Sequence, residues 1–160
     1  MAKPLELAPE GFLFMVDRAL DGMVQILNSL GDELVNQRPD LDGANSPFGI
    51  VTHCIGVARW WSGEVVGGGT VARDREAEFS ATGRVADLVA RIPEAREALA
   101  DAVAAGGWAE KNRGPVPAGF ADTPVGLTRG GALLHVYEEL AQHLGHLEIT
   151  RDILLARARG

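Results

Sequence analysis

Cysteine is almost absent from this chain of 160 residues, and its scarcity excludes several classes of protein. Cys54 is the single cysteine, so neither a disulfide within the chain nor a zinc site built from cysteines can form. A chain that needs no disulfides suits a reducing compartment. Residues 1–6 also lack the basic stretch followed by an apolar stretch that marks a secretion signal. The sequence therefore predicts a cytoplasmic protein.

Long apolar runs and an excess of positive charge are also missing. No segment approaches the roughly 18 uninterrupted apolar residues of a membrane-spanning helix. Acidic residues outnumber basic ones by 22 to 15, which gives a net charge of −7 and a pI near 5.0. This charge repels polyanions, so neither nucleic acid nor an acidic membrane surface is an expected partner. With 46% hydrophobic residues, the chain is too apolar to be disordered and long enough for one domain over residues 1–160.

Apolar residues recur at helical spacing in four stretches, and no stretch shows the alternation typical of a strand. The first stretch is followed by Gly31, a residue type that commonly ends a helix. The second begins with a proline after Asn45 or Ser46, either of which can cap it, and stops at a run of glycines. The third contains Pro93, which should kink the helix or split it near Val89. The expected helices cover residues 9–30, 47–66, 82–105 and 128–158.

The connections between these stretches differ in character. Residues 70–80 are charged and are expected to form a solvated crossover. Residues 106–126 contain three prolines and five glycines without periodicity. Loops of that length inside a compact domain often form a lid or the wall of a site. Four helices joined in this way predict an all-α fold, a four-helix bundle with a long crossover connection.

The last predicted helix carries an unusual set of polar residues on one face. With Glu139 at 0° and about 100° added per residue, His143 falls at about +40°, His146 at about −20° and His135 at about −40°. Leucines and a valine share this side of the helix, so the polar side chains are expected to face the core. Burying an unpaired carboxylate costs several kcal/mol, and no lysine or arginine occurs on this face before Arg151. A bound metal ion is the simplest way to hold these groups together.

The second predicted helix adds one more inward-facing polar residue, His53, which shares its face with apolar residues. His53, Glu139 and His143 make a set of two histidines and one carboxylate, the last two being neighbours one helical turn apart. Three protein ligands leave an open position for water or substrate, which is typical of catalytic metal sites. The roles of His146 and His135 are left undecided by the sequence: each is a metal ligand, a partner that orients Glu139, or a hydrogen-bond donor in a pocket wall.

Other motifs are absent or have a simpler explanation. The chain lacks the His-Glu-x-x-His motif of zinc proteases and the paired Glu-x-x-His motifs of di-metal bundles. The glycine run at residues 67–69 lacks the lysine and hydroxyl residue of a phosphate-binding loop, so a linker is expected there. Cys54 lies about 100° round the helix from His53 and is expected to pack as a small apolar residue. Of Trp60 and Trp61, one is expected in the core and one at a pocket rim.

Two segments together resemble the DinB-like superfamily, and more closely its actinobacterial branch of mycothiol-dependent enzymes, to which maleylpyruvate isomerase is related through its N-terminal domain. Residues 45–61, which include His53, are similar to the second helix of that family and its single ligand histidine. Residues 138–148 are similar to its last helix. The resemblance covers nearly the whole chain. It implies a four-helix bundle, often dimeric, with a metal at one end that is commonly zinc and sometimes nickel or iron.

The resemblance also implies a chemistry. Relatives with assigned activities use mycothiol, bacillithiol or glutathione, and the metal lowers the pKa of that thiol and presents a thiolate to an electrophile. Leu147 stands where many relatives have a second histidine four residues after His143, so the ligand pair implied here is Glu139 and His143, as in the isomerase. The isomerase carries a further C-terminal domain that this chain lacks after Gly160, so isomerase activity itself is not expected.

The first hypothesis is therefore a divalent-metal-dependent S-transferase, most simply with zinc, that joins a mycothiol-type thiol to a small electrophile and forms a homodimer. His146 or Tyr137 would assist proton transfer, and Arg59 and Arg151 would contact carboxylates of the thiol or the substrate. A second hypothesis is a metal-stabilised bundle that only binds a ligand or a partner protein, which a closed site including His146 as fourth ligand would favour. A third is a bundle without metal whose polar face is only hydrogen-bonded.

Overall fold

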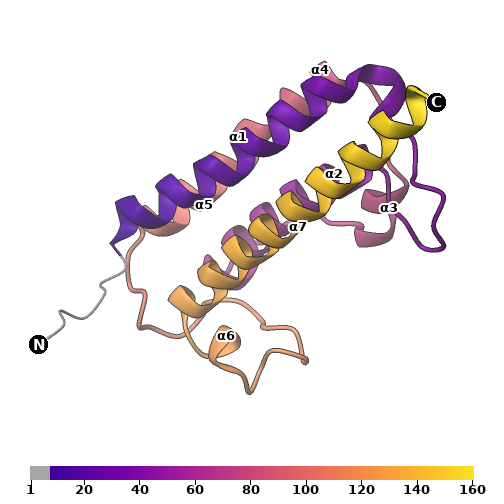
Figure 1. The fold of residues 1–160 in the computed structure, drawn as a ribbon. Helices are drawn as coiled ribbons and strands as arrows, with labels where there is room; N and C mark the ends of the chain where they lie inside the picture. The colour runs from indigo at the N-terminus through magenta and orange to yellow at the C-terminus, as the bar shows by residue number, and fades with distance from the viewer. Residues whose placement is uncertain (1–7) are drawn as a thin grey trace, which may run out of the picture.

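A computed structural model describes residues 8–160 (Figure 1). Residues 1–7, and with them the expectation about a secretion signal, lie outside the described residues. The described part contains helices and no strand, which confirms the all-α prediction. Its elements are α1 (Pro9–Leu34), α2 (Pro47–Trp60), the π-helical turn η1 (Trp61–Val66), α3 (Arg75–Ser80), α4 (Val85–Val89), α5 (Ile92–Ala104), α6 (Pro124–Leu127) and α7 (Arg129–Ala158).

Helix α1 buries one face along its whole length. A proline lies in its first turn, and buried residues such as Phe12, Leu20 and Leu27 recur at helical spacing. Gly31, the expected end of this helix, instead adopts a left-handed, non-helical conformation (φ 68°, ψ 177°), after which the helix resumes as far as Leu34. Residues with a side chain disfavour a positive φ, so glycine at this position allows the helix to kink and continue where the sequence predicted that it would end.

Helix α2 begins as predicted. The hydroxyl of Ser46 accepts a hydrogen bond from the N–H of Gly49 at 3.1 Å, and proline occupies the first turn. At Trp61 the helix widens into η1, which ends at the glycine run starting at Gly67. π-Helical turns are rare and occur frequently at functional sites.

The loop of residues 106–126 is fastened to this π-helical turn. The N–H of Gly114 donates to the carbonyl of Val65 at 2.9 Å, and the side-chain amide of Asn112 donates to the carbonyl of Gly126 at 2.8 Å. A Cβ on Gly114 would lie 2.0 Å from the carbonyl oxygen of Glu64, so only glycine allows this close approach. The long loop is therefore anchored to the end of the α2–η1 segment.

The segment between η1 and α5 confirms the predicted break near Pro93 but contains a short helix that was not predicted. The third expected helix is split into α4 and α5 beside Pro93, as predicted. The preceding charged residues, expected to form a solvated crossover, include the short helix α3, which Asp74 caps by accepting a hydrogen bond from the N–H of Ala77 at 3.0 Å. Glu78 of this helix is buried. The crossover therefore supplies a buried carboxylate, which corrects the expectation for residues 70–80.

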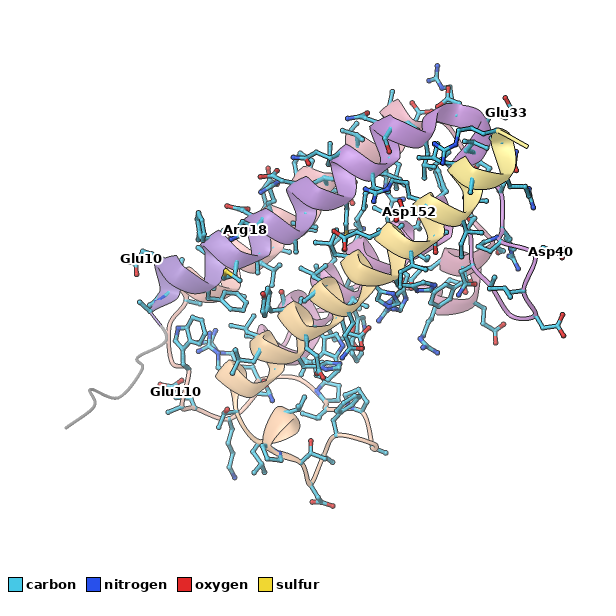
Figure 2. The ribbon with its side chains drawn as sticks, in the orientation of Figure 1. Glu10, Arg18, Glu33, Asp40, Glu110 and Asp152 are labelled. Atoms are coloured by element: carbon cyan, nitrogen blue, oxygen red, sulfur yellow. The ribbon has the colours of Figure 1, made fainter. Side chains whose placement is uncertain are left out.

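Helix α7 is the longest element, and it packs on α1, α2 and η1. The hydroxyl of Thr128 caps it by accepting from the N–H of Gly131 at 3.1 Å. Helix α5 packs on α1 and α2, so that α1 lies beside α5 and α2 lies beside α7 (Figure 1). Charged residues such as Arg18 and Asp152 lie on the outside of these helices (Figure 2). Within residues 8–160, no helix combines the length and apolarity needed to cross a membrane.

Cys54 packs in the core, as predicted, with none of its surface exposed. Burial raises the pKa of its thiol well above the usual range, and the Glu139 and Glu78 carboxylates raise it further. Because the thiolate is the reactive form, a disulfide reagent such as DTNB is expected to label the folded protein about a hundredfold more slowly than the urea-unfolded chain. Labelling of the folded protein as fast as that of the unfolded chain would contradict this burial.

Candidate metal centre

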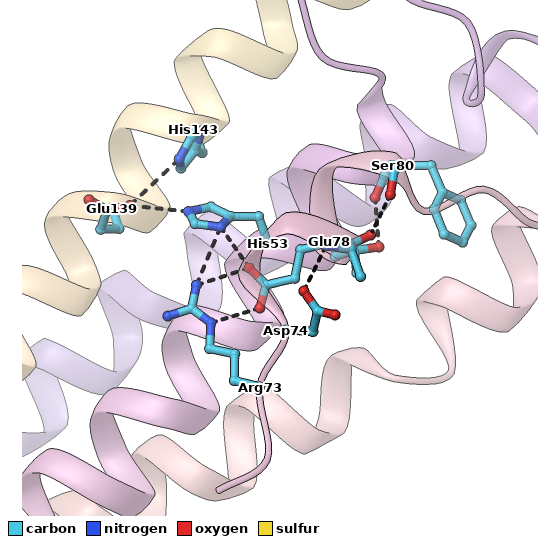
Figure 3. Close-up of polar contacts among 10 residues, drawn as sticks. His53, Arg73, Asp74, Glu78, Ser80, Glu139 and His143 are labelled. Atoms are coloured by element: carbon cyan, nitrogen blue, oxygen red, sulfur yellow. Dashed lines mark hydrogen bonds and ion pairs between the residues drawn. The ribbon is translucent and has the colours of Figure 1, made fainter.

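Three side chains from α2 and α7 meet where the two helices pack together. Nε2 of His53 lies 3.5 Å from Oε2 of Glu139, and Nε2 of His143 lies 3.6 Å from the same oxygen (Figure 3). One ligand atom from each residue lies within 4.8 Å of the others, so the group could hold a metal ion. The structure thus brings together the two histidines and the carboxylate that helical spacing singled out.

The spacing of these atoms fits a small divalent ion. Zinc binds imidazole nitrogen and carboxylate oxygen at about 2.0–2.1 Å, and a tetrahedral arrangement then separates neighbouring ligand atoms by about 3.3 Å. The two measured separations, 3.5 and 3.6 Å, are close to that value. The His143 imidazole, and then that of His53, hold the pKa of Glu139 well below its usual range. The carboxylate is therefore ionised, as a metal ligand must be.

His53 is held from its other side by Glu78, a residue that the sequence pattern did not single out. Nδ1 of His53 lies 2.9 Å from Oε2 of Glu78 (Figure 3). Because an ionised carboxylate can only accept a hydrogen bond, Nδ1 carries a proton, and Nε2, the nitrogen that faces Glu139, is the atom available to bind a metal ion. Metal-binding histidines commonly donate their second N–H to a carboxylate in this way, which fixes the tautomer and the ring orientation.

Arg73 fixes Glu78 in turn. Its Nε donates to Oε1 of Glu78 at 2.7 Å, and its Nη2 donates to Oε2 at 2.9 Å. The side chains of His53, Glu78 and Arg73 are only 4%, 8% and 13% exposed. A Cβ on Gly56 would lie 2.0 Å from Oε1 of Glu78, so a glycine on α2 leaves the space that the carboxylate occupies. The paired, hydrogen-bonded arginine offsets the cost of burying this charge.

The polar face of α7 is less buried than its spacing predicts. The side chains of Glu139 and His143 are 28% and 22% exposed, and His146 is exposed. The expectation that His146 faces the core is therefore wrong. The buried stripe is centred on Leu140 and Leu147, which lie against the neighbouring helices. Glu139 and His143 lie at the margin of that stripe, and His146 lies beyond it.

His135 is buried because other residues cover its end of α7. Its ring centroid lies 4.8 Å from that of Trp61 and 4.7 Å from that of Phe120. Its Nε2 is 3.8 Å from Oε1 of Glu139, and its Nδ1 is 3.2 Å from Oε2 of Glu138. His135 therefore approaches the oxygen of Glu139 that is turned away from His53 and His143, outside the group of ligand atoms.

A cavity of about 440 Å³ lies beside the three side chains. Trp61 is buried and Trp60 is half-buried in its wall, as predicted for this pair. Phe120, from the 106–126 loop, packs edge-on against Trp61 at a centroid distance of 5.3 Å, so that loop forms part of the wall. The lining consists of His53, Val57, Trp60, Trp61, Arg73, Arg75, Pro117, Phe120, His135 and Glu139.

Four residues suggested for proton transfer or carboxylate binding do not line this cavity. Tyr137 packs against the core, and His146 is exposed beside His143. Arg59 pairs with a glutamate of α5 at 3.2 Å and lines a separate cavity, and Arg151 pairs with the aspartate that follows it at 2.9 Å. The arginines that do line the cavity beside the metal centre belong to the crossover: Arg73 and Arg75.

Comparison with known proteins places this geometry in a family. No curated protein matches the chain. A family model described as mycothiol-S-transferase matches residues 12–155, a span that contains His53, Glu139 and His143. The match covers most of the chain and agrees with the resemblance drawn from the motifs around these residues. The chain therefore belongs to the mycothiol-S-transferase family.

Proposed function

We propose that this protein is a divalent-metal-dependent S-transferase that joins a low-molecular-weight thiol of the mycothiol type to a small electrophile. The observation that carries the proposal is the group of His53, Glu139 and His143 beside a cavity of about 440 Å³, two of whose lining residues belong to the group. That volume lies in the range of small-molecule sites. Membership of the family supports the class of reaction.

Each part of the site then has a chemical task. A divalent ion held by His53, Glu139 and His143 would lower the pKa of a thiol and so favour its thiolate. With a substitution substrate such as an aryl chloride, the sulfur forms a bond to the electrophilic carbon, the leaving group departs with the electron pair of the bond that breaks, and the thiol proton passes to solvent. With an unsaturated substrate, the sulfur adds to one carbon of the double bond, and the electron pair of the broken π bond takes up a proton at the neighbouring carbon. Trp60 and Phe120 offer flat apolar surfaces against which an unsaturated or aromatic electrophile packs. His135 lies 3.8 Å from the second oxygen of Glu139 and forms part of the cavity wall beside it.

The arrangement favours catalysis over the purely binding role. A bundle stabilised by a closed site would use a fourth protein ligand, for which His146 was the candidate. His146 is exposed and is not part of the group of ligand atoms. Three protein ligands leave a position for a thiol, as in catalytic zinc sites.

Further features of the proposal rest on the family resemblance. They are a DinB-like four-helix-bundle topology, a homodimer, and zinc as the resident metal with nickel or iron as alternatives. The proposed cytoplasmic location rests instead on the scarcity of cysteine and on residues 1–6. The packing of α1, α2, α5 and α7 against one another is compatible with such a bundle.

The test is an S-transfer assay with zinc-loaded protein, mycothiol and 1-chloro-2,4-dinitrobenzene. We expect the thioether conjugate to form faster than in the protein-free reaction, as measured by mass spectrometry, and the excess rate to disappear after chelation and return with zinc. Glutathione in place of mycothiol tests the choice of thiol. Tight metal and thiol binding without conjugate formation, across a panel of electrophiles, would instead support a binding protein.

A further inference from the structure

Two arginines give the cavity beside the metal centre a cationic wall. Arg73 and Arg75 both line it, and among residues 8–160 the lining contains one carboxylate, that of Glu139, a member of the metal-binding group. Glu78 lies behind this wall and already pairs with Arg73, so Arg75 is the positive charge that the wall leaves for a ligand. A cavity lined by charge of one sign attracts ligands of the other sign.

Both guanidinium groups lie near aromatic rings. The Arg73 guanidinium carbon lies 6.0 Å from the centroid of the Trp60 ring, and that of Arg75 lies 5.9 Å from the centroid of the Phe79 ring. Phe79 itself stacks on His53 at a centroid distance of 4.4 Å. The metal ligand His53, one aromatic ring and the Arg75 guanidinium are therefore in successive contact.

The two arginines retain donors that no carboxylate within residues 8–160 uses. Nε and Nη2 of Arg73 donate hydrogen bonds to Glu78, and within residues 8–160 its Nη1 has no hydrogen-bond partner. In the same part of the chain, Arg75 forms no ion pair, in contrast to Arg59, which is paired with Glu94. Guanidinium groups present donors in a planar fork that matches a carboxylate.

We propose that Arg75, assisted by Nη1 of Arg73, binds a carboxylate carried by one of the two reactants, while the reacting sulfur or carbon lies at the metal centre. This inference rests on the proposed function, because it assigns the substrate class of the same site. The carboxylate belongs either to the electrophile or to a thiol with a free carboxyl group, such as glutathione; mycothiol has none, because its cysteinyl carboxyl is bound in an amide. An unsaturated or aromatic carboxylic acid matches both walls of the cavity: its carboxylate would bind the arginines, and its flat apolar part would pack against the aromatic side chains.

A binding experiment tests the subsite without relying on catalysis. Titration calorimetry compares trans-cinnamate with uncharged cinnamamide, on the zinc-loaded protein and on the protein after chelation. We expect cinnamate to bind about five- to tenfold more tightly than cinnamamide in both forms, as for a partly exposed charge-assisted contact. Arg75→Gln should remove that preference. Arg18→Gln, which removes the same charge from the outside of α1 (Figure 2), should leave it unchanged.

Kinetics then distinguish the source of the carboxylate. With mycothiol fixed, an unsaturated acid is compared with its methyl ester. With a neutral electrophile fixed, N-acetylcysteine is compared with its amide. We expect Arg75→Gln to raise KM for the acid of one pair about tenfold and to leave its neutral partner within about twofold. Equal binding of cinnamate and cinnamamide, or a preference that survives Arg75→Gln, would overturn the carboxylate subsite. Conjugation of neutral electrophiles would meanwhile show that the transferase proposal stands independently.

Discussion

Replacing His143 with alanine is expected to leave the protein folded and unable to retain a divalent metal. The imidazole supplies one of three ligand atoms grouped within 4.8 Å, and the remaining two make a much weaker site. The side chain lies at the margin of the core, so its removal costs little packing. We expect metal content to fall from nearly one ion per chain to less than about a tenth of that, with the helical circular dichroism unchanged. Elemental analysis of tag-free protein measures the difference.

His146→Ala is the matched control for this experiment. His146 lies on the same helix with its ring near that of His143, at a centroid distance of 6.0 Å, and it is outside the group of ligand atoms. The His146 variant should keep its metal. Full metal content in His143→Ala would show that the ligands were chosen wrongly, and loss of metal in His146→Ala would enlarge the ligand set. His53 is a less clean choice for the first test, because it is buried and its loss also removes one of the two side chains that contact Glu78, the other being Arg73.

Replacing Glu78 with alanine is expected to weaken zinc binding about 10- to 100-fold, although Glu78 is not itself a ligand. The change removes the acceptor of the Nδ1 proton of His53 and leaves Nη2 of Arg73, a donor, 3.4 Å from that nitrogen, so the Nδ1-protonated tautomer is no longer favoured. It also leaves Arg73, whose side chain is mostly buried, without its carboxylate partner. Competition with a chromophoric chelator measures the affinity. Nitrogen-15 NMR of the histidine rings should show His53 protonated on Nδ1 in the parent protein and as a mixture of tautomers in the variant.

Two further variants test whether Glu78 orients the His53 ring or only holds the crossover segment in place. Glu76→Gln removes a carboxylate from the exposed side of the same short helix and should leave zinc affinity unchanged. Gly56→Ala keeps Glu78 but places a Cβ against its Oε1, so it should lower affinity in the same direction as Glu78→Ala. An unchanged affinity and an unchanged tautomer in Glu78→Ala would mean that Glu78 only fastens the crossover.

The metal-binding group could be predicted because its signal is periodic. Glu139 and His143 are one turn apart on a long helix, and His53 lies among apolar residues that α2 buries almost completely. Helical spacing therefore determined which side chains share a face. It did not determine how deeply that face is buried, because the depth depends on which helices pack against it. For this reason His146, close to Glu139 in angle, lies in solvent.

The residues that hold the metal-binding group in place have no comparable periodic pattern in the sequence. Arg73, Arg75 and Glu78 lie in a charged segment, and α3 has only six residues, too few for an apolar stripe. A buried glutamate with its arginine cannot be told from solvated charges until the helix that provides the space, here at Gly56, is in position. Similarly, the prolines and glycines of residues 106–126 indicated a loop at a site, but not that Phe120 would pack against Trp61.

The π-helical turn η1 lies between the part of α2 that carries His53 and the anchor of the loop that completes the cavity wall. His53 lies upstream of it, in regular helix, where its position relative to α7 is set by core packing. Downstream, Val65 anchors Gly114 and thereby the loop that carries Phe120 into the cavity wall. An insertion or deletion in that loop would reshape the wall while the ligand residues on α2 and α7 stay in place, whereas η1 itself is buried against α7. Divergent members of such a lineage would then keep one reaction and exchange their substrates.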